Sequence, residues 1–205
     1  RALISENGEM FGEEYTLVAV ADYVLKHTPG NTVSNLSSSR ALKDVTEAYG
    51  QQYHAAAVGE VNVVAEMKRT HSVIGGEGNG GVIYPESHYG RDALVGVGLF
   101  LSHYVAQSKK MTELKSTYPP YFISKNKMTL SPDMDVDKIL EGLKERYATE
   151  KVTDIDGVKI DFAQGWVHLR KSNTEPIIRI YSEAKDEAAA NQLAEEVIAA
   201  AKSTF

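Results

Sequence analysis

The sequence contains no cysteine, and this absence excludes disulfide bridges and thiol-based catalysis. It also lacks any apolar run near the roughly 18 to 20 residues that cross a bilayer, and its first residues do not resemble a signal peptide. We therefore expect no membrane partner. A chain free of cysteine is compatible with a reducing compartment, and we expect a cytoplasmic location.

The sequence also has no excess of basic over acidic residues. Lys and Arg number 22 against 28 Asp and Glu, which gives a net charge of −6. Because nucleic acids are polyanions, an acidic chain is a poor partner for them, and we expect no nucleic-acid binding. Hydrophobic residues at 42% and charged residues at 24% are usual for folded domains. The 205 residues are enough for one large domain or two small ones.

The first 117 residues alternate helix-like and strand-like segments. Apolar spacing and short apolar runs predict helices over 13–26, 39–49, 62–69 and 92–105, and strands over 32–36, 53–58, 71–74 and 82–84. This alternation is typical of an α/β layered domain with a mostly parallel sheet. The segment 92–105 is apolar on most faces, so we expect this helix to be buried deep in the domain.

A domain boundary is predicted at Tyr118-Pro119-Pro120, because each proline fixes φ and lacks an amide proton. The domains would therefore span 1–117 and 118–205. In the second, we expect strands over 121–129, 166–171 and 177–181, a hairpin at Asp156-Gly157, and helices over 136–147 and 186–202. The first of these helices would be capped by Asp133 or Asp135. The pattern predicts a smaller α+β domain with an antiparallel sheet and two backing helices.

Residues 75–81 form a glycine cluster that contains G-x-G-x-x-G. A dinucleotide site requires a helix directly after this motif, whereas here a strand-like run follows and stops at Pro85. The polar residues among these glycines are Glu77 and Asn79, and a carboxylate beside an amide can bind adjacent sugar hydroxyls. The alternative is a flexible surface loop, and residue types alone leave both interpretations open.

A second polar segment, residues 170–179, carries three basic residues and one glutamate, which gives a local charge of +2 in an acidic chain. Hydroxyl, amide and guanidinium groups in such a segment can converge on a phosphate. The candidate phosphate-binding residues are Arg170, Ser172, Asn173, Thr174 and Arg179. A solvated β-turn is the alternative, because hydroxyl and amide residues are common in turns.

Other catalytic and metal-binding patterns are missing from the sequence. The six histidines show no HExxH spacing, and there is no G-x-S-x-G nucleophile motif. The aspartates at 133, 135 and 137 are better explained as acids at a helix start than as metal ligands. We expect no catalytic residue and no metal ligand in this chain.

Together, Gly75-Gly76-Glu77-Gly78-Asn79-Gly80-Gly81 and Arg170-Lys171-Ser172-Asn173-Thr174-Glu175-Pro176 resemble two motifs of the alpha-D-phosphohexomutase superfamily. This superfamily comprises phosphoglucomutases, phosphomannomutases and phosphoglucosamine mutases. Three shorter matches occur in family order, Ser38-Ser39-Arg40, Val58-Gly59-Glu60 and Gly90-Arg91-Asp92-Ala93. The resemblance covers nearly the whole chain. It implies that 1–117 corresponds to the sugar-recognition third domain and 118–205 to the phosphate-binding fourth domain.

The resemblance also implies roles for individual residues. Glu77, Asn79 and Gly59 would bind the sugar, and the five candidates in segment 170–179 would bind the phosphate that is not reacting. Many family members carry histidine where this chain has Gly81. The phosphoserine loop of the first domain and the Asp-x-Asp-x-Asp-Arg magnesium loop of the second are both missing here, so the chain resembles domains three and four alone.

The implied function is part of an enzyme that interconverts hexose 1-phosphate and hexose 6-phosphate through a bisphosphorylated intermediate. Magnesium, hexose 1,6-bisphosphate and the N-terminal domains would belong to a full-length parent, and this chain alone would be inactive. The alternative is a non-catalytic module that binds sugar phosphates. An upstream reading frame with the serine and magnesium loops would distinguish the two. The sugar remains open among mannose, glucose and glucosamine phosphates.

Overall fold

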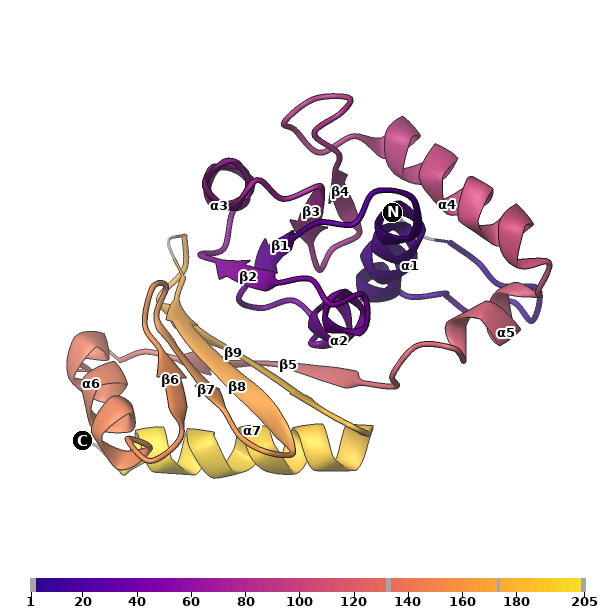
Figure 1. Cartoon of the computed structure of the whole chain (residues 1–205). Coiled ribbons are helices and arrows are strands. Elements are labelled where there is room, and N and C mark those ends of the chain that lie inside the picture. The colour runs from indigo at the N-terminus through magenta and orange to yellow at the C-terminus, as the bar shows by residue number, and fades with distance from the viewer. Residues whose placement is uncertain (1–2, 132–133, 173, 204–205) are drawn as a thin grey trace. The chain divides into compact units, whose positions relative to one another are not determined.

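The computed structural model describes residues 3–131, 134–172 and 174–203. The chain forms two compact units, Arg1–Pro120 and Tyr121–Phe205, and each is described by itself (Figure 1). The first combines helices with a mostly parallel sheet, and the second is an α+β unit with an antiparallel sheet. The predicted fold class is confirmed. Among the helices that the structure describes, none combines the length and apolar character needed to cross a bilayer.

The first unit ends at Pro120, slightly beyond the boundary expected after residue 117, because Tyr118 and Pro119 are bonded into it. Tyr118 is buried, and its hydroxyl donates to Asp22 Oδ2 at 3.0 Å. The hydroxyl of Tyr15 donates to the carbonyl of Pro119 at 2.7 Å. These two bonds fix the last residues of the unit to its first helix.

Asp22 is the centre of this buried network. It also accepts from the hydroxyl of Tyr49 at 2.6 Å and lies 3.3 Å from Nε2 of His103. Burial alone would raise the pKa of Asp22, but the hydrogen bonds from His103, Tyr49 and Tyr118 outweigh it and lower this pKa. The network therefore holds an ionised carboxylate inside the unit.

The helices of the first unit are α1 (Glu13–His27), α2 (Ala41–Ala48), α3 (Glu60–Thr70), α4 (Ala93–Gln107) and α5 (Met111–Lys115). Its strands are β1 (Thr32–Asn35), β2 (Tyr53–Ala56), β3 (Ile74–Glu77) and β4 (Gly81–Ile83). The sheet order is β2-β1-β3-β4; the first three strands are parallel and β4 is antiparallel to β3. Because β4 follows the glycine cluster as a strand, the structure agrees with the rejection of a dinucleotide site.

Strand β3 lies inside the glycine cluster rather than before it, which differs from the strand expected over 71–74. The reason is close packing from both faces of the sheet. A Cβ on Gly75 would lie 2.6 Å from Sδ of Met67 in α3, and a Cβ on Gly76 would lie 3.1 Å from Cδ1 of Leu17 in α1. The two glycines let α3 and α1 approach opposite faces of β3, and only residues 78–80 form a turn.

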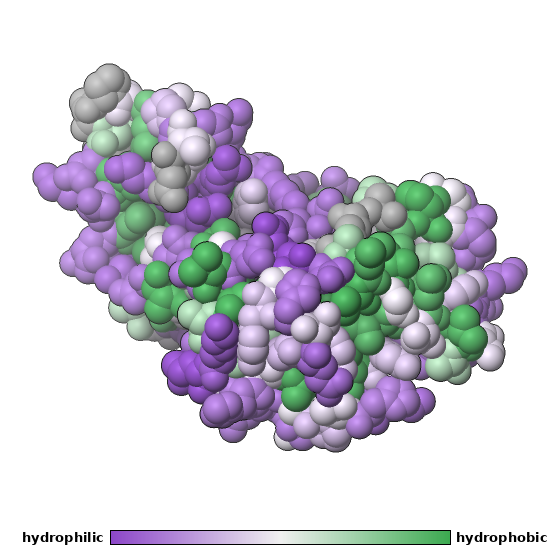
Figure 2. Space-filling view, turned by 90° about the horizontal axis from the view of Figure 1, so that it is seen from above, coloured by the Kyte–Doolittle hydropathy of each residue, from purple (hydrophilic) through white to green (hydrophobic). Residues whose placement is uncertain are grey.

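The apolar helix α4 is not buried along its length, so that expectation was wrong. Its buried residues are Gly96, Phe100 and His103, and Phe100 packs edge-to-face on Phe11 with ring centroids 5.1 Å apart. Hydrophobic surface gathers over this helix in Figure 2. The exposed apolar residues are Leu94, Val97, Leu101 and Val105, with exposed fractions of 83%, 39%, 52% and 73%. Their spacing of three and four places them on one face.

The strands of the second unit are β5 (Phe122–Thr129), β6 (Lys151–Thr153), β7 (Val158–Asp161), β8 (Gly165–Lys171) and β9 (Ile177–Ala184). Its helices are α6 (Val136–Arg146) and α7 (Glu187–Lys202), as the sequence predicted. The order β5-β9-β8-β7-β6 is antiparallel throughout. Both helices contribute buried side chains to one core with the sheet, and Leu143, Leu169, Ile180 and Val197 lie at its centre.

Two local signals of this unit behave as expected. Asp135 caps α6 by accepting from the amides of Asp137 and Lys138, while the other candidate, Asp133, lies outside the described residues. Gly157 has φ 66° in the connection between β6 and β7, a conformation that favours glycine. The hairpin and the helix start are therefore set by local chemistry.

We predict that the second unit loses stability in acid because of His168. This side chain is buried in β8, and burial lowers its pKa to about 4 from the usual 6.5. Between these values the unfolded chain binds a proton that the folded unit does not, so the free energy of unfolding falls as pH falls, by about 3 kcal/mol at most. Denaturant titrations at pH 7.5 and 4.5 should show this loss, and His168→Gln should reduce it while His27→Gln should not.

Candidate functional site

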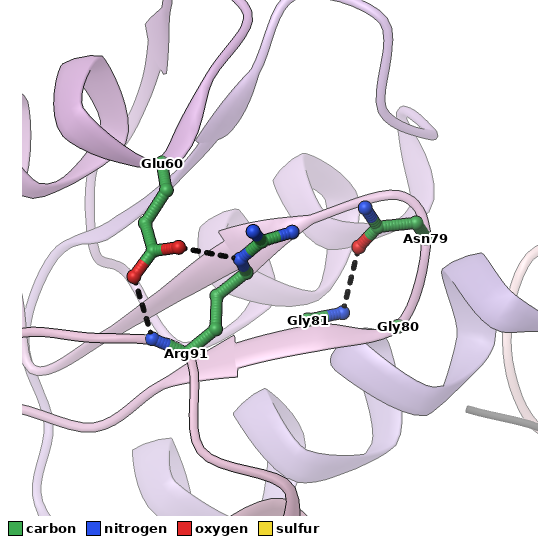
Figure 3. A pocket seen from close by; sticks show the side chains of 5 residues that line it. All are labelled: Glu60, Asn79, Gly80, Gly81 and Arg91. Atoms are coloured by element: carbon green, nitrogen blue, oxygen red, sulfur yellow. Dashed lines mark hydrogen bonds and ion pairs between the residues drawn. The ribbon is translucent and has the colours of Figure 1, made fainter.

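A pocket of about 440 Å³ opens beside the turn between β3 and β4. Its lining consists of Glu60, Asn79, Gly80, Gly81 and Arg91 (Figure 3), and we call it the β3–β4 pocket. These residues come from the start of α3, the turn itself, and the segment before α4. An isolated bridge between Ile83 and Arg91 brings the last segment back to the sheet. The pocket thus combines residues far apart in the sequence.

Arg91 is held by Glu60 through two hydrogen bonds, both drawn in Figure 3. The backbone N–H of Arg91 donates to Oε1 at 2.9 Å, and its Nε donates to Oε2 at 2.7 Å. The backbone and side-chain bonds from Arg91 lower the pKa of Glu60, and the bond to Glu60 raises the pKa of the guanidinium. Both groups therefore stay charged, and the arginine is oriented from one side.

Glu77, a predicted sugar-binding residue, is buried at the end of β3 with an exposed fraction of 6%. Its Oε1 accepts from Nδ2 of Asn35 at 3.2 Å, and its Oε2 pairs with Nη1 of Arg91 at 2.9 Å. The carboxylate is therefore already engaged by two partners. Glu77 is not itself part of the lining of the β3–β4 pocket, and its ion pair with Arg91 connects it to that lining.

Asn79 lies in the pocket lining, and its Oδ1 accepts from the amide of Gly81 at 3.0 Å, which closes the turn (Figure 3). Gly59, the third predicted sugar-binding residue, is the residue before α3 and has φ 120°. It precedes Glu60 but is not part of the lining. The structure thus places Glu77 directly before the turn and Asn79 within it. Gly59 lies outside the pocket lining, next to Glu60.

His88 has a structural partner next to this pocket. Its Nε2 lies 3.0 Å from Oδ2 of Asp92, and Asp92 caps α4 by accepting from the amides of Leu94 and Val95. The amide of Val95 and the contact with His88 lower the pKa of Asp92. These contacts order the segment that carries Arg91.

In the second unit, the phosphate-binding candidates lie where β8 turns into β9. Arg170 and Arg179 are direct cross-strand partners, so their side chains leave the same face of the sheet. Ser172 is buried, and the amide of Thr174 donates to its Oγ at 3.4 Å. Asn173 lies outside the described residues. The strand pairing therefore gathers two cations beside a hydroxyl-rich turn.

A groove of about 280 Å³ lies beside this turn, and we call it the basic groove. Its lining residues are Lys125, Asn126, Lys127, Glu175, Ile177, Arg179 and Tyr181. The register pairs Lys125 with Tyr181 and Lys127 with Arg179, so β5 and β9 present their cations on one face. Arg179 also pairs with Glu175 at 3.1 Å. The groove keeps net positive charge despite this pair.

The residues that the structure describes contain no group of three or more His, Asp or Glu side chains arranged to hold a metal ion. Magnesium prefers several oxygen ligands, and the nearby carboxylates of Glu60 and Glu77 are both occupied by Arg91. The described residues therefore do not fit a magnesium site.

Comparison with known protein families gives two matches that together span most of the chain. Residues 12–121 match the model of the phosphoglucomutase/phosphomannomutase alpha/beta/alpha domain III, and residues 125–200 match that of the C-terminal domain. The chain belongs to the phosphoglucomutase/phosphomannomutase family. Its identification with the third and fourth domains of phosphohexomutases is confirmed.

Relatives within this family are longer than the chain. A phosphoglucomutase/phosphomannomutase of Thermococcus kodakarensis is 36% identical over 195 residues, which cover 94% of this chain and 42% of the relative. A solved family protein of Burkholderia thailandensis has a TM-score of 0.82 at 22% identity, with 99% of this chain and 44% of that chain covered. The chain therefore spans less than half the length of the proteins it matches.

The N-acetylphosphoglucosamine mutase of Aspergillus fumigatus shares the fold, with a TM-score of 0.65 at 13% identity over 97% of this chain and 49% of that chain. Its structure was solved with GlcNAc-6P and magnesium, and a second structure of it contains glucose 1,6-bisphosphate. That enzyme therefore binds a sugar phosphate together with magnesium.

Sequence reasoning named no role for Glu60, Arg91, Lys125 and Lys127. A usable signal existed for the lysines, because Lys125 and Lys127 alternate in a predicted strand and so share one face. The bonds of Arg91 to Glu60 join residues 31 positions apart, and no local pattern indicates them. The family motifs Val58-Gly59-Glu60 and Gly90-Arg91-Asp92-Ala93 contain these two residues, but they do not indicate that the residues are in contact.

We predict that Asn79→Ala loosens the turn of the β3–β4 pocket. The substitution removes the acceptor for the Gly81 amide, a bond worth about 1 kcal/mol, so this amide should exchange with solvent several-fold faster. Hydrogen exchange followed by NMR measures the rate, and Asn79→Asp, which keeps the acceptor, is the matched control. Equal protection of Gly81 in all three proteins would show that the side chain does not hold the turn.

Proposed function

We propose that this chain is the sugar- and phosphate-binding part of a phosphohexomutase that interconverts hexose 1-phosphate and hexose 6-phosphate. The observation that carries the proposal is that each of the two matched domains contains one candidate binding site, and that the two sites differ in chemistry. The unit that matches domain III has a pocket lined by one carboxylate, one side-chain amide and one guanidinium, and the unit that matches the C-terminal domain has cations beside a hydroxyl-bearing turn.

Each site suits one part of a sugar phosphate. Guanidinium and ammonium groups bind phosphate oxygens through charge-assisted hydrogen bonds, and Arg170 and Arg179 leave the same face of the sheet. Carboxylate and amide groups such as those of Glu77 and Asn79 bind adjacent hydroxyls. Of the remaining phosphate-binding candidates, Ser172 and Thr174 lie between β8 and β9, while Asn173 lies outside the described residues. Gly59 directly precedes Glu60 at the start of α3.

The reaction moves a phosphoryl group between O1 and O6 through a bisphosphorylated sugar. Phosphoryl transfer depends chiefly on positioning and charge neutralisation. In this proposal the phosphoserine donor and the magnesium ligands belong to N-terminal domains of a longer polypeptide, and this chain alone is inactive. Its own residues hold the sugar and the non-reacting phosphate, and hexose 1,6-bisphosphate is the intermediate. Glucose, mannose and glucosamine phosphates all remain candidate substrates.

The exposed face of α4 supports the proposal of N-terminal domains as a partner. Four large apolar side chains lie on one face of a helix that has no Asp, Glu, Lys or Arg among its residues 93–107. Contiguous apolar surface of this kind marks an interface. We infer that the preceding domains cover this face.

We predict that phosphate binds to segment 170–179. Arg170→Ala removes a charge-assisted contact worth about 1.5 to 3 kcal/mol, so the dissociation constant for inorganic phosphate should rise at least about tenfold. NMR titration of the chain measures it, and Lys185→Ala is the control because Lys185 lies beyond the end of β9. If phosphate shifts amides elsewhere and leaves 170–179 unchanged, the phosphate site is wrongly placed.

We predict that Leu101→Glu affects the full-length protein more than the isolated chain. In the chain Leu101 is half exposed, so the unfolding midpoint should change little, whereas a charge buried beneath the preceding domains should lower the midpoint by several degrees. Ile155→Glu, at an exposed apolar residue of the second unit, is the control. Equal midpoint changes in both polypeptides would contradict the inference. A dimer of the chain dissociated by Leu101→Glu would instead identify a second copy as the partner.

A further inference from the structure

The charges of the β3–β4 pocket do not cancel. Arg91 pairs with two carboxylates, Glu60 at 2.7 Å and Glu77 at 2.9 Å, so the cluster of three groups carries a net charge of −1. Glu60 uses one oxygen for the Arg91 backbone and the other for its side chain. The guanidinium is therefore fixed in position by acidic groups on two elements, the start of α3 and the end of β3.

One terminal nitrogen of Arg91 remains available. Nε is taken by Glu60 and Nη1 by Glu77, while Nη2 has no partner among the residues that the structure describes. The Arg91 side chain is 40% exposed and belongs to the lining of the β3–β4 pocket, beside Asn79 (Figure 3). A guanidinium N–H that faces a pocket is a hydrogen-bond donor for an oxygen of a bound molecule.

Gly81 makes this position possible. A Cβ on residue 81 would lie 2.6 Å from Cδ and 3.3 Å from Cγ of Arg91, and 3.0 Å from Oδ1 of Asn79, so its tightest contact would be with Arg91. The backbone φ of Gly81 is not positive, so the backbone conformation does not require glycine here. Glycine is required because a side chain would have no room. The stem of Arg91 therefore fills the volume that a side chain on residue 81 would need.

We propose that Arg91 is a third recognition residue of the β3–β4 pocket, that it donates from Nη2 to a sugar hydroxyl, and that Glu60 is its positioning residue. This inference rests on the proposed function and adds a residue that sets sugar specificity. It makes Gly81 and Arg91 a coupled pair, because the arginine occupies its place only while residue 81 has no side chain.

The charge balance decides which part of the ligand Arg91 contacts. A phosphate in this pocket would approach a guanidinium that is already paired with Glu60 in the lining and with the buried Glu77. The net charge of −1 on these three groups would oppose its binding. A sugar hydroxyl is neutral. Its oxygen can accept a hydrogen bond from Nη2 of Arg91, while its O–H donates to a carboxylate oxygen or to Oδ1 of Asn79. The ligand class for Arg91 is therefore the uncharged, hydroxyl-bearing face of a hexose.

The test measures binding of methyl α-D-glucopyranoside and of inorganic phosphate to the 205-residue chain by NMR titration. Arg91→Ala should raise the dissociation constant for the glucoside about tenfold, as expected for a lost charged donor, and leave that for phosphate within about twofold. Gly81→Ala should weaken glucoside binding to a similar degree, because its Cβ displaces the arginine. The double variant should be no weaker than either single one.

Two controls separate recognition from folding. Arg69→Ala removes an exposed arginine that pairs with Glu66 on α3 in the same way, and it should leave glucoside binding unchanged. Arg91→Lys keeps the positive charge without the planar fork and should restore only part of the affinity. Unfolding midpoints of all variants show whether a loss of binding follows from a loss of fold.

The outcomes distinguish this inference from the proposed function. If Arg91→Ala binds the glucoside normally while Glu77→Gln does not, Arg91 is not a recognition residue and the function stands. If the losses in Gly81→Ala and Arg91→Ala simply add, the two residues are not coupled and the inference fails. If Arg91→Ala weakens phosphate binding instead, the ligand class is wrong. If the unsubstituted chain binds none of the methyl glycosides of glucose, mannose and glucosamine, both proposals are overturned.

Discussion

Strand β3 is the constraint on which the first unit depends, because helices press on it from both faces. A Cβ on Gly75 would lie 2.6 Å from Sδ of Met67, and a Cβ on Gly76 would lie 2.0 Å from the carbonyl oxygen of Gly81 and 3.1 Å from Cδ1 of Leu17. Interiors packed at this density allow almost no movement of the enclosed strand. The next residue along the strand is Glu77, so the end of β3 delivers the buried carboxylate to a fixed place. The turn and the β3–β4 pocket are built outward from that point.

In the proposed function, the two units divide the binding of a sugar phosphate between them. In the first, a guanidinium is outnumbered by carboxylates, which favours neutral hydroxyl groups. In the second, Lys125, Lys127 and Arg179 share one face of a sheet, which favours anions. A net charge of −6 for the whole chain conceals this division. The charge of the side chains that lie together at one site therefore says more about the ligand than the net charge of the chain does.

Much of the fold follows from the sequence, because helical and strand periodicities record which side of each element is buried. On the terminal helix α7, helical spacing indicates a buried stripe of Leu193, Ala194, Val197 and Ile198; the first three are buried and Ile198 is partly buried. The same logic failed for α4. Its pattern indicates burial, yet four of its apolar residues are exposed in this chain. An apolar pattern shows which residues would gain from burial, but it cannot say what covers them.

The candidate site was predictable only where composition is unusual. Glu77 and Asn79 stand out because glycines surround them, and segment 170–179 stands out for its charge. Asn35 and Glu60, which hold Glu77 and Arg91, lie in ordinary surroundings and reach their partners across the fold. Such contacts depend on the packing of β1, β3 and α3, and no short-range rule predicts them. The positions of the supporting residues therefore required the structure.

The shared volume of residues 81 and 91 also restricts the order in which sequence change can occur. A lineage that gains a side chain at residue 81 while Arg91 is still in place passes through a crowded intermediate. A lineage that first shortens residue 91 passes through an intermediate with an empty space and two carboxylates, Glu60 and Glu77, that have lost their counter-charge. Both single changes carry a cost, so residues 81 and 91 are expected to change together.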